Sequence, residues 1–140
     1  MSSGFGPGFQ SAQSRLYRAE YAAIGLAIIG YLVWRTYHPG GIDWLQVVFW
    51  VAFPDLVAFS AIGTSSKRRE WPSWGSGLYN LTHTILVWGA AFVVLWVLSG
   101  AVYLPLLGWL GHIAVDRAVG YGLRARPSVE GSASAVGASG

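Results

Sequence analysis

The chain has 140 residues, of which 54% are hydrophobic and only 11% are charged, and its formal net charge is +3. A soluble domain usually carries about 25% charged residues, so this composition argues against a water-soluble globule and favours a membrane protein. The absence of cysteine excludes disulfides, thiolate metal ligands and cysteine nucleophiles. The basic residues form no stripe on a soluble element, which argues against nucleic-acid binding.

The composition changes along the chain and predicts three regions. Residues 1–14 hold no basic residue and no long apolar run, so we expect a flexible leader and not a signal peptide. Residues 15–126 contain all of the strongly apolar sequence and form the predicted membrane domain. Residues 127–140 are mostly Ser, Ala and Gly, which cannot bury enough apolar surface to offset the entropy of ordering, and they are predicted to be a disordered tail.

Four apolar segments follow one another in the membrane domain. They run from about Ala19 to Tyr37, Ile42 to Ile62, Leu78 to Leu98 and Val102 to Gly120. Each is close to the roughly 20 residues that a helix needs to cross a bilayer. The sequence therefore predicts an all-α fold, a bundle of four transmembrane helices. The two-residue link Ser99-Gly100 predicts that the third and fourth helices form a tight antiparallel hairpin.

The basic residues predict the orientation of these helices. Eight of the nine Lys and Arg residues fall on one side: Arg15, Arg18, Lys67, Arg68, Arg69, Arg117, Arg124 and Arg126. Only Arg35 falls on the other side. Because basic residues concentrate in cytoplasmic loops, both termini are expected in the cytoplasm. The run Lys67-Arg68-Arg69 is then interpreted as an anchor that touches anionic lipid and not as a specific ligand site.

Several ionisable residues lie inside the apolar segments, where a charge is costly and usually has a function. They are Asp55 in the second segment, His83 in the third, and His112 and Asp116 in the fourth. A rise of about 1.5 Å per residue puts them about 10, 8, 12 and 6 Å from the inner ends of their helices. Since three helices place polar groups at similar depth, we expect at least three of these side chains within about 8 Å of a common centre.

The local spacing of these residues favours a shared site. His112 and Asp116 are four residues apart, so they lie on one helix face, where they can bind one metal or where the carboxylate can orient the imidazole. Asp55 follows Pro54, which has no amide hydrogen; this frees the carbonyl of Trp50 and favours a kink.

Two histidines and two aspartates suit a divalent metal such as Zn²⁺, Mn²⁺ or Fe²⁺. A metal with an open coordination position could activate water, so the first functional hypothesis is a metal-dependent hydrolase or an acid–base site that acts on a lipid-phase substrate. In this hypothesis the metal ligands and catalytic groups are Asp55, His83, His112 and Asp116, and the supporting residues are Glu20, Asn80 and Arg117.

Two alternatives stay open. The polar residues could be structural, because a histidine in a membrane helix often bonds a neighbouring helix, and Asp116 could be neutralised by the adjacent Arg117. In a second class of function, the chain is a non-catalytic accessory subunit of a larger membrane complex. Such a subunit would contact pigment, haem or quinone, with His112 or His83 as an axial ligand.

Short motifs surround the same residues. They are Arg18-x-Glu20, Pro54-Asp55-Leu56, Tyr79-Asn80-x-x-His83 and the longer His112-Ile113-x-x-Asp116-Arg117-x-x-Gly120-Tyr121-Gly122-Leu123. With these motifs, residues 15–124 resemble an uncharacterised bacterial four-helix membrane family, domain of unknown function 4260. The resemblance implies four spans and a place in the bacterial inner (plasma) membrane, but no particular activity. Members of the family often carry a further histidine-containing segment after the last motif, where this chain has its Ser/Ala/Gly tail.

Overall fold

The computed structural model describes residues 14–62 and 73–123. Within these ranges every regular element is a helix, as predicted. The elements are α1 (Arg15–Thr36), α2 (Trp44–Ile62), α3 (Ser73–Thr82), α4 (Ile85–Ser99), the short 3-10 helix η1 (Leu104–Leu106) and α5 (Leu107–Val119). The predicted leader, the Lys67-Arg68-Arg69 run and the predicted disordered tail lie outside the described residues.

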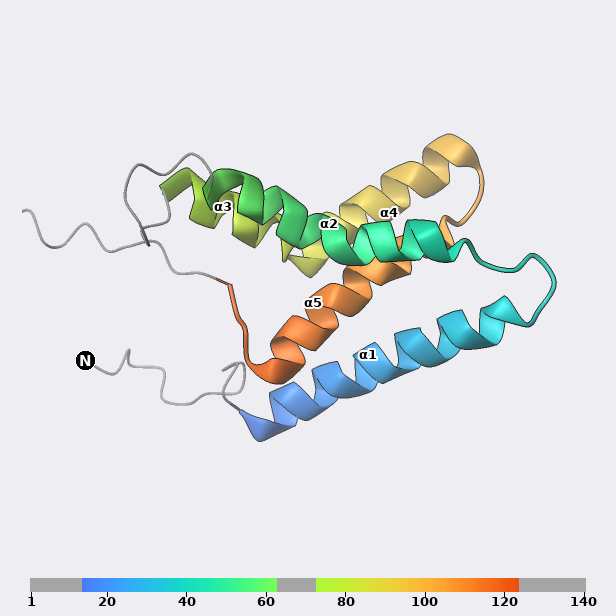
Figure 1. Cartoon of the computed structure of the whole chain (residues 1–140), viewed down its shortest axis with the longest axis horizontal. Coiled ribbons are helices and arrows are strands. Elements are labelled where there is room, and N and C mark those ends of the chain that lie inside the picture. The colour runs from blue at the N-terminus through green and yellow to red at the C-terminus, as the bar shows by residue number, and fades with distance from the viewer. Residues whose placement is uncertain (1–13, 63–72, 124–140) are drawn as a thin grey trace, which may run out of the picture.

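Helix α5 is the centre of the arrangement (Figure 1). It packs against α1 on one side and α2 on another, and α3 packs against α2. The first residues of α1 and α3 and the last residues of α2 and α5 lie toward one end of the molecule. The α1–α2 connection and the end of α4 lie toward the opposite end. Successive passes along the long axis therefore alternate in direction, with α3 and α4 together making one pass.

Small residues set how closely α5 approaches its neighbours. On α1 the buried residues are Gly25, Ile28 and Leu32, whose spacing of three and four residues forms a single helix face. On α5 a Cβ atom at Gly108 would lie 2.5 Å from the carbonyl oxygen of Val47. Because no side chain fits in that space, glycine is what allows the backbones of α2 and α5 to approach closely.

The predicted third helix, residues 78–98, is wrong as a single element. It consists of α3 and α4, whose axes differ by 59° across a short break. At the break the carbonyl of Thr82 accepts a hydrogen bond from Trp109 Nε1 at 2.6 Å. The carbonyl of His83 accepts one from the Arg117 guanidinium at 3.3 Å. These donors from α5 replace bonds that a continuous helix would supply, so the break needs neither glycine nor proline.

The connection into α5 also differs from the prediction. Helix α4 ends at Ser99, and Gly100 follows in a left-handed conformation with a φ of 68°. The predicted helix start at Val102 is too early, because η1 comes first and α5 begins at Leu107. The link is therefore longer than the predicted two residues. At the other end, Gly120 is the left-handed cap of α5.

One helix of the described chain, α1, is both long and apolar enough to cross a membrane. The bent pair α3–α4 meets the same criterion when it is counted as one broken span, and α2 is apolar but shorter.

Candidate metal site

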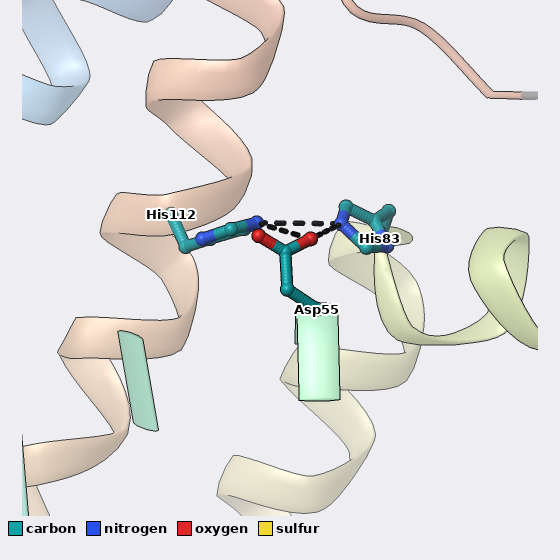
Figure 2. Close-up of side chains that lie close together, drawn as sticks. All are labelled: Asp55, His83 and His112. Atoms are coloured by element: carbon teal, nitrogen blue, oxygen red, sulfur yellow. Dashed lines mark hydrogen bonds and ion pairs between the residues drawn. The ribbon is translucent and has the colours of Figure 1, made fainter. Parts of the chain in front are cut away.

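Four polar side chains from three parts of the chain meet at one place. Asp55 comes from α2, His83 directly follows α3, and His112 and Asp116 lie on successive turns of α5. Figure 2 shows Asp55, His83 and His112 pointing toward one another. We call Asp55, His83, His112 and Asp116 the His/Asp cluster.

The nitrogen and oxygen atoms of the cluster are close together. The two imidazole Nε2 atoms, of His83 and His112, lie 3.3 Å apart. Asp55 Oδ1 lies 3.6 Å from each of them. Asp116 Oδ2 lies 3.4 Å from His83 Nε2 and 3.5 Å from His112 Nε2. The predicted convergence of these side chains is confirmed.

The cluster is buried on its histidine side and open on its aspartate side. The His83 side chain is 3% exposed, whereas that of Asp55 is 46% exposed. Pro54 is fully buried beside Asp55 and fixes the backbone there. Buried residues therefore fix the positions of the cluster, while the exposed Asp55 leaves it accessible to a small molecule from the side of α2.

Tyr79 orients the His83 ring. The His83 Nδ1 atom lies 2.9 Å from the Tyr79 carbonyl oxygen, and the two rings stack with centroids 3.8 Å apart. Since a carbonyl can only accept, Nδ1 of His83 carries the proton that it donates to Tyr79. In a neutral imidazole this leaves the lone pair on Nε2, which faces the cluster.

The cluster consequently gathers acceptors with few donors. His83 Nε2 and the carboxylates of Asp55 and Asp116 are all acceptors, and a neutral His112 supplies at most one proton to them. Buried lone pairs at such distances are unfavourable without a positive charge between them. The arrangement fits either protons shared among these groups or a bound cation.

Arg117 does not supply that positive charge. Its guanidinium donates to Tyr17 Oη at 2.7 Å and to the His83 carbonyl at 3.3 Å, and it lies over the ring of Tyr21. Among the residues described, the ion pairs of Asp116 are with His83 and His112. The alternative in which Arg117 neutralises Asp116 is therefore wrong, and Arg117 instead links α5 to α1 and to the α3–α4 break.

The spacing of the cluster suits a transition metal. Zn²⁺ binds imidazole nitrogen at about 2.0–2.1 Å, so the ligand atoms of a tetrahedral site lie about 3.4 Å apart. The distances of 3.3 Å between the nitrogens and 3.6 Å from each nitrogen to Asp55 match this edge length. Asp55, His83 and His112 each offer a ligand atom, and these atoms all lie within 4.8 Å of one another.

The family defined as "Domain of unknown function (DUF4260)" matches residues 14–132, which is most of the chain and includes the whole cluster. The chain belongs to this family. The resemblance inferred from the short motifs is thus confirmed. No curated protein and no solved structure matches the sequence.

The motifs of this DUF4260 chain can now be assigned to contacts. The tyrosine that opens the third motif stacks on the histidine that closes it, a role that sequence reasoning did not assign. Its signal was the spacing of four residues between Tyr79 and His83, the same spacing that joins His112 to Asp116. Trp109, three residues before His112, was also missed, although it is the buried donor at the break.

The supporting residues of the DUF4260 chain have mixed outcomes. Glu20 is exposed on α1 and, within the described chain, forms no ion pair with the cluster. Asn80 lies in α3, where its carbonyl accepts a hydrogen bond from the Thr84 hydroxyl. Beside His83, Asp116 and Arg117 there is a cavity of about 10 Å³, a space for about one water molecule.

Proposed function

We propose that this chain is a multi-pass membrane protein that binds one divalent transition-metal ion at the His/Asp cluster and uses it to hydrolyse a lipid-phase substrate. The observation that carries the proposal is the facing pair of imidazole Nε2 atoms, 3.3 Å apart, with Asp55 Oδ1 3.6 Å from both. The orientation of His83 by the Tyr79 carbonyl supports it, because metal-bound histidines usually donate their second N–H to such an acceptor.

The ligand set indicates which metals fit and what they would do. Two imidazoles and a carboxylate suit Zn²⁺, Mn²⁺ or Fe²⁺. Asp55, His83 and His112 would hold the ion, and a metal with three protein ligands, as in hydrolytic zinc sites, would supply a water activated by a pKa lowered to about 7. Asp116, which lies beside both nitrogens, is placed to accept the proton of that water. In hydrolysis of an ester, Asp116 would take a proton from the attacking water and return it to the leaving oxygen as the bond from that oxygen to the carbonyl carbon or phosphorus breaks.

The exposed surface supports insertion in a bilayer. The 15-residue helix α4 is almost entirely apolar and has no buried residue, so Leu86, Val93 and Val97 face outward. Soluble proteins rarely expose apolar patches of that extent. The 22 residues of α1 span about 33 Å, close to the roughly 30 Å of a bilayer core.

The distribution of charge supports four passes with cytoplasmic termini. Arg15 and Arg18 lie at the first turns of α1, and Arg117 lies near the end of α5, which is at the same end of the molecule in Figure 1. Arg35 lies at the opposite end of α1. The broken pass α3–α4 is compatible with a membrane because its freed carbonyls are bonded inside the protein by Trp109 and Arg117.

The test is the metal content of the full chain purified in a gentle detergent, measured together with any co-purifying protein. We expect about one equivalent of Zn, Mn or Fe in the wild type and loss of most of it in His83→Ala and His112→Ala. His38→Ala is the matched control, because His38 is exposed beyond the end of α1 and stacks on Trp34. That variant should keep the full metal content.

The contrary outcomes are distinct. A metal-free wild type with stoichiometric partners would replace the proposal with the accessory-subunit hypothesis, and bound haem or quinone would assign His83 or His112 to that ligand. A metal-free protein that purifies alone, and that loses only about 0.6 kcal/mol of stability in either histidine variant, would make the cluster a structural contact.

A further inference from the structure

A second feature adjoins the cluster: a cavity of about 260 Å³ among α1, α2 and α5. Its floor is apolar and buried, formed by Ile28, Leu32 and Val47. An apolar cavity of about 150 Å³ is sufficient to hold benzene, so this one has space for a larger apolar group. The cavity exists because α1 and α2 both pack on α5 and leave a space between them.

The cavity opens outward between α1 and α2. Ile29, Val51 and Val115 line it and are 52%, 41% and 48% exposed. All three side chains are aliphatic, so the opening is lined by apolar groups at these positions. In a bilayer this opening would face lipid chains, and an aliphatic group could enter without crossing water.

One end of the cavity reaches the His/Asp cluster. His112 lines the cavity, and its Nε2 atom belongs to the cluster. The cavity also has an indole, that of Trp44, whose Nε1 already donates to the Thr36 hydroxyl. The remaining lining residues are aliphatic or glycine, so His112 is the polar group that a ligand in the cavity would meet.

We infer that this cavity binds the single hydrocarbon chain of a lipid-phase molecule whose polar end lies at His112. The inference rests on the proposed function for the role of that polar end, since the group beside His112 would be the one hydrolysed. It identifies the substrate class as an aliphatic chain with an ester-type head, whose hydrolysis gives the free acid. Three glycines, Gly25, Gly108 and Gly111, keep the walls on α1 and α5 free of side chains.

The cavity can be filled from Gly111, which lies in its wall on α5. A Cβ atom there would lie 3.6 Å from Ile28 Cγ2, an ordinary contact, so Gly111→Ala should be tolerated. Gly111→Leu would extend into the cavity. Val51→Trp is a second way to block it, from the exposed opening. Gly30→Leu is the matched control, because a Cβ atom at Gly30 meets nothing within 4 Å and Gly30 does not line the cavity.

The probes are dodecanoate and hexanoate, and binding is measured by native mass spectrometry of the full chain released from detergent. Each buried methylene strengthens binding about fourfold, so we expect dodecanoate to bind the wild type at least 50-fold more tightly than hexanoate does, allowing for incomplete burial. Gly111→Ala and Gly30→Leu should bind dodecanoate like the wild type. Gly111→Leu and Val51→Trp should each lose about tenfold or more.

Metal content on the same samples separates this inference from the proposed function. Chain-length dependence that is lost in the blocked variants supports the cavity even if the protein holds no metal, in which case only the hydrolytic proposal fails. Metal-loaded protein that binds both acids equally, or blocked variants that bind dodecanoate like the wild type, would overturn the inference and leave the metal site intact. If Gly111→Leu does not fold, Val51→Trp alone decides the question.

Discussion

Replacing Gly108 with alanine tests whether the α2–α5 contact positions the His/Asp cluster. The added Cβ atom would lie 2.5 Å from the Val47 carbonyl oxygen and 3.3 Å from the Val51 amide nitrogen. Both are backbone atoms, so no side chain can rotate away. Ordinary contacts begin at 3.4 Å, and relieving the first contact requires α2 and α5 to separate by about 0.9 Å, the difference between the two distances.

Separating α2 from α5 at this contact would also move Asp55 away from His112. Asp55 lies one turn beyond Val51 on α2, and His112 lies one turn beyond Gly108 on α5. Overpacking of this kind costs about 1–3 kcal/mol, while alanine gains up to about 1 kcal/mol over glycine as a helix former. Gly30→Ala should show only the gain in helix propensity, because its Cβ atom meets nothing within 4 Å. The two variants should therefore differ by about 1–3 kcal/mol in the free energy of unfolding.

The assay is unfolding of the purified chain by SDS titration, followed by circular dichroism, with metal affinity measured by competition with a chelator. We expect metal affinity to fall at least about tenfold in Gly108→Ala, as it does when groups that support a metal ligand are disturbed, and to stay unchanged in Gly30→Ala. Equal stability and equal metal affinity in the two variants would refute the reasoning that this contact positions Asp55 against His112.

Three further outcomes are expected. Reporter fusions at Ser99 and at Gly140 should report opposite sides of the membrane, and the same side for both would exclude the four-pass topology. Trp109→Phe should lower the free energy of unfolding by about 1 kcal/mol, because a carbonyl at the α3–α4 break loses its donor; unchanged unfolding would mean that this bond does not stabilise the break. Arg117→Met should weaken metal binding about tenfold, because the carbonyl of the metal ligand His83 loses its hydrogen bond to Arg117. Arg35→Met, which loses a hydrogen bond to the Pro39 carbonyl in the α1–α2 connection, should leave metal binding unchanged. Equal effects of the two variants would point to a general loss of charge.

The convergence of the cluster could be predicted because the distance of a residue from the end of its helix follows from the number of residues between them. With a fixed rise per residue, the positions of Asp55, His83 and His112 within their apolar segments give similar heights. The i, i+4 spacing then places Asp116 on the His112 face. These are local properties of a regular helix, so they needed no knowledge of the tertiary structure.

The break at His83 could not be predicted in the same way. The sequence around it has no glycine or proline at residues 82–85. The donors that satisfy the freed carbonyls, Trp109 and Arg117, lie far along the chain on α5. A tertiary contact thus overrides the local helical pattern, and a window of sequence around His83 does not contain that information.

Arg117 shows a different limit of sequence reasoning. Its neighbour in sequence is Asp116, which suggested an ion pair between the two. Adjacent residues on a helix point in different directions, so they do not face each other. Asp116 accordingly points toward the histidines, whereas Arg117 donates hydrogen bonds to Tyr17 and to the backbone carbonyl of His83.

The break between α3 and α4 also determines which helix controls the direction of α4. In an unbroken span the hydrogen bonds of one turn fix the path of the next. Here the carbonyls of Thr82 and His83 are bonded by side chains of α5, and His83 itself reaches α5 through His112. The 59° change of axis between α3 and α4 is therefore maintained by contacts from α5. A change in charge between His83 and His112, or the binding of a ligand there, would therefore act on the same few residues that orient the 15-residue helix α4.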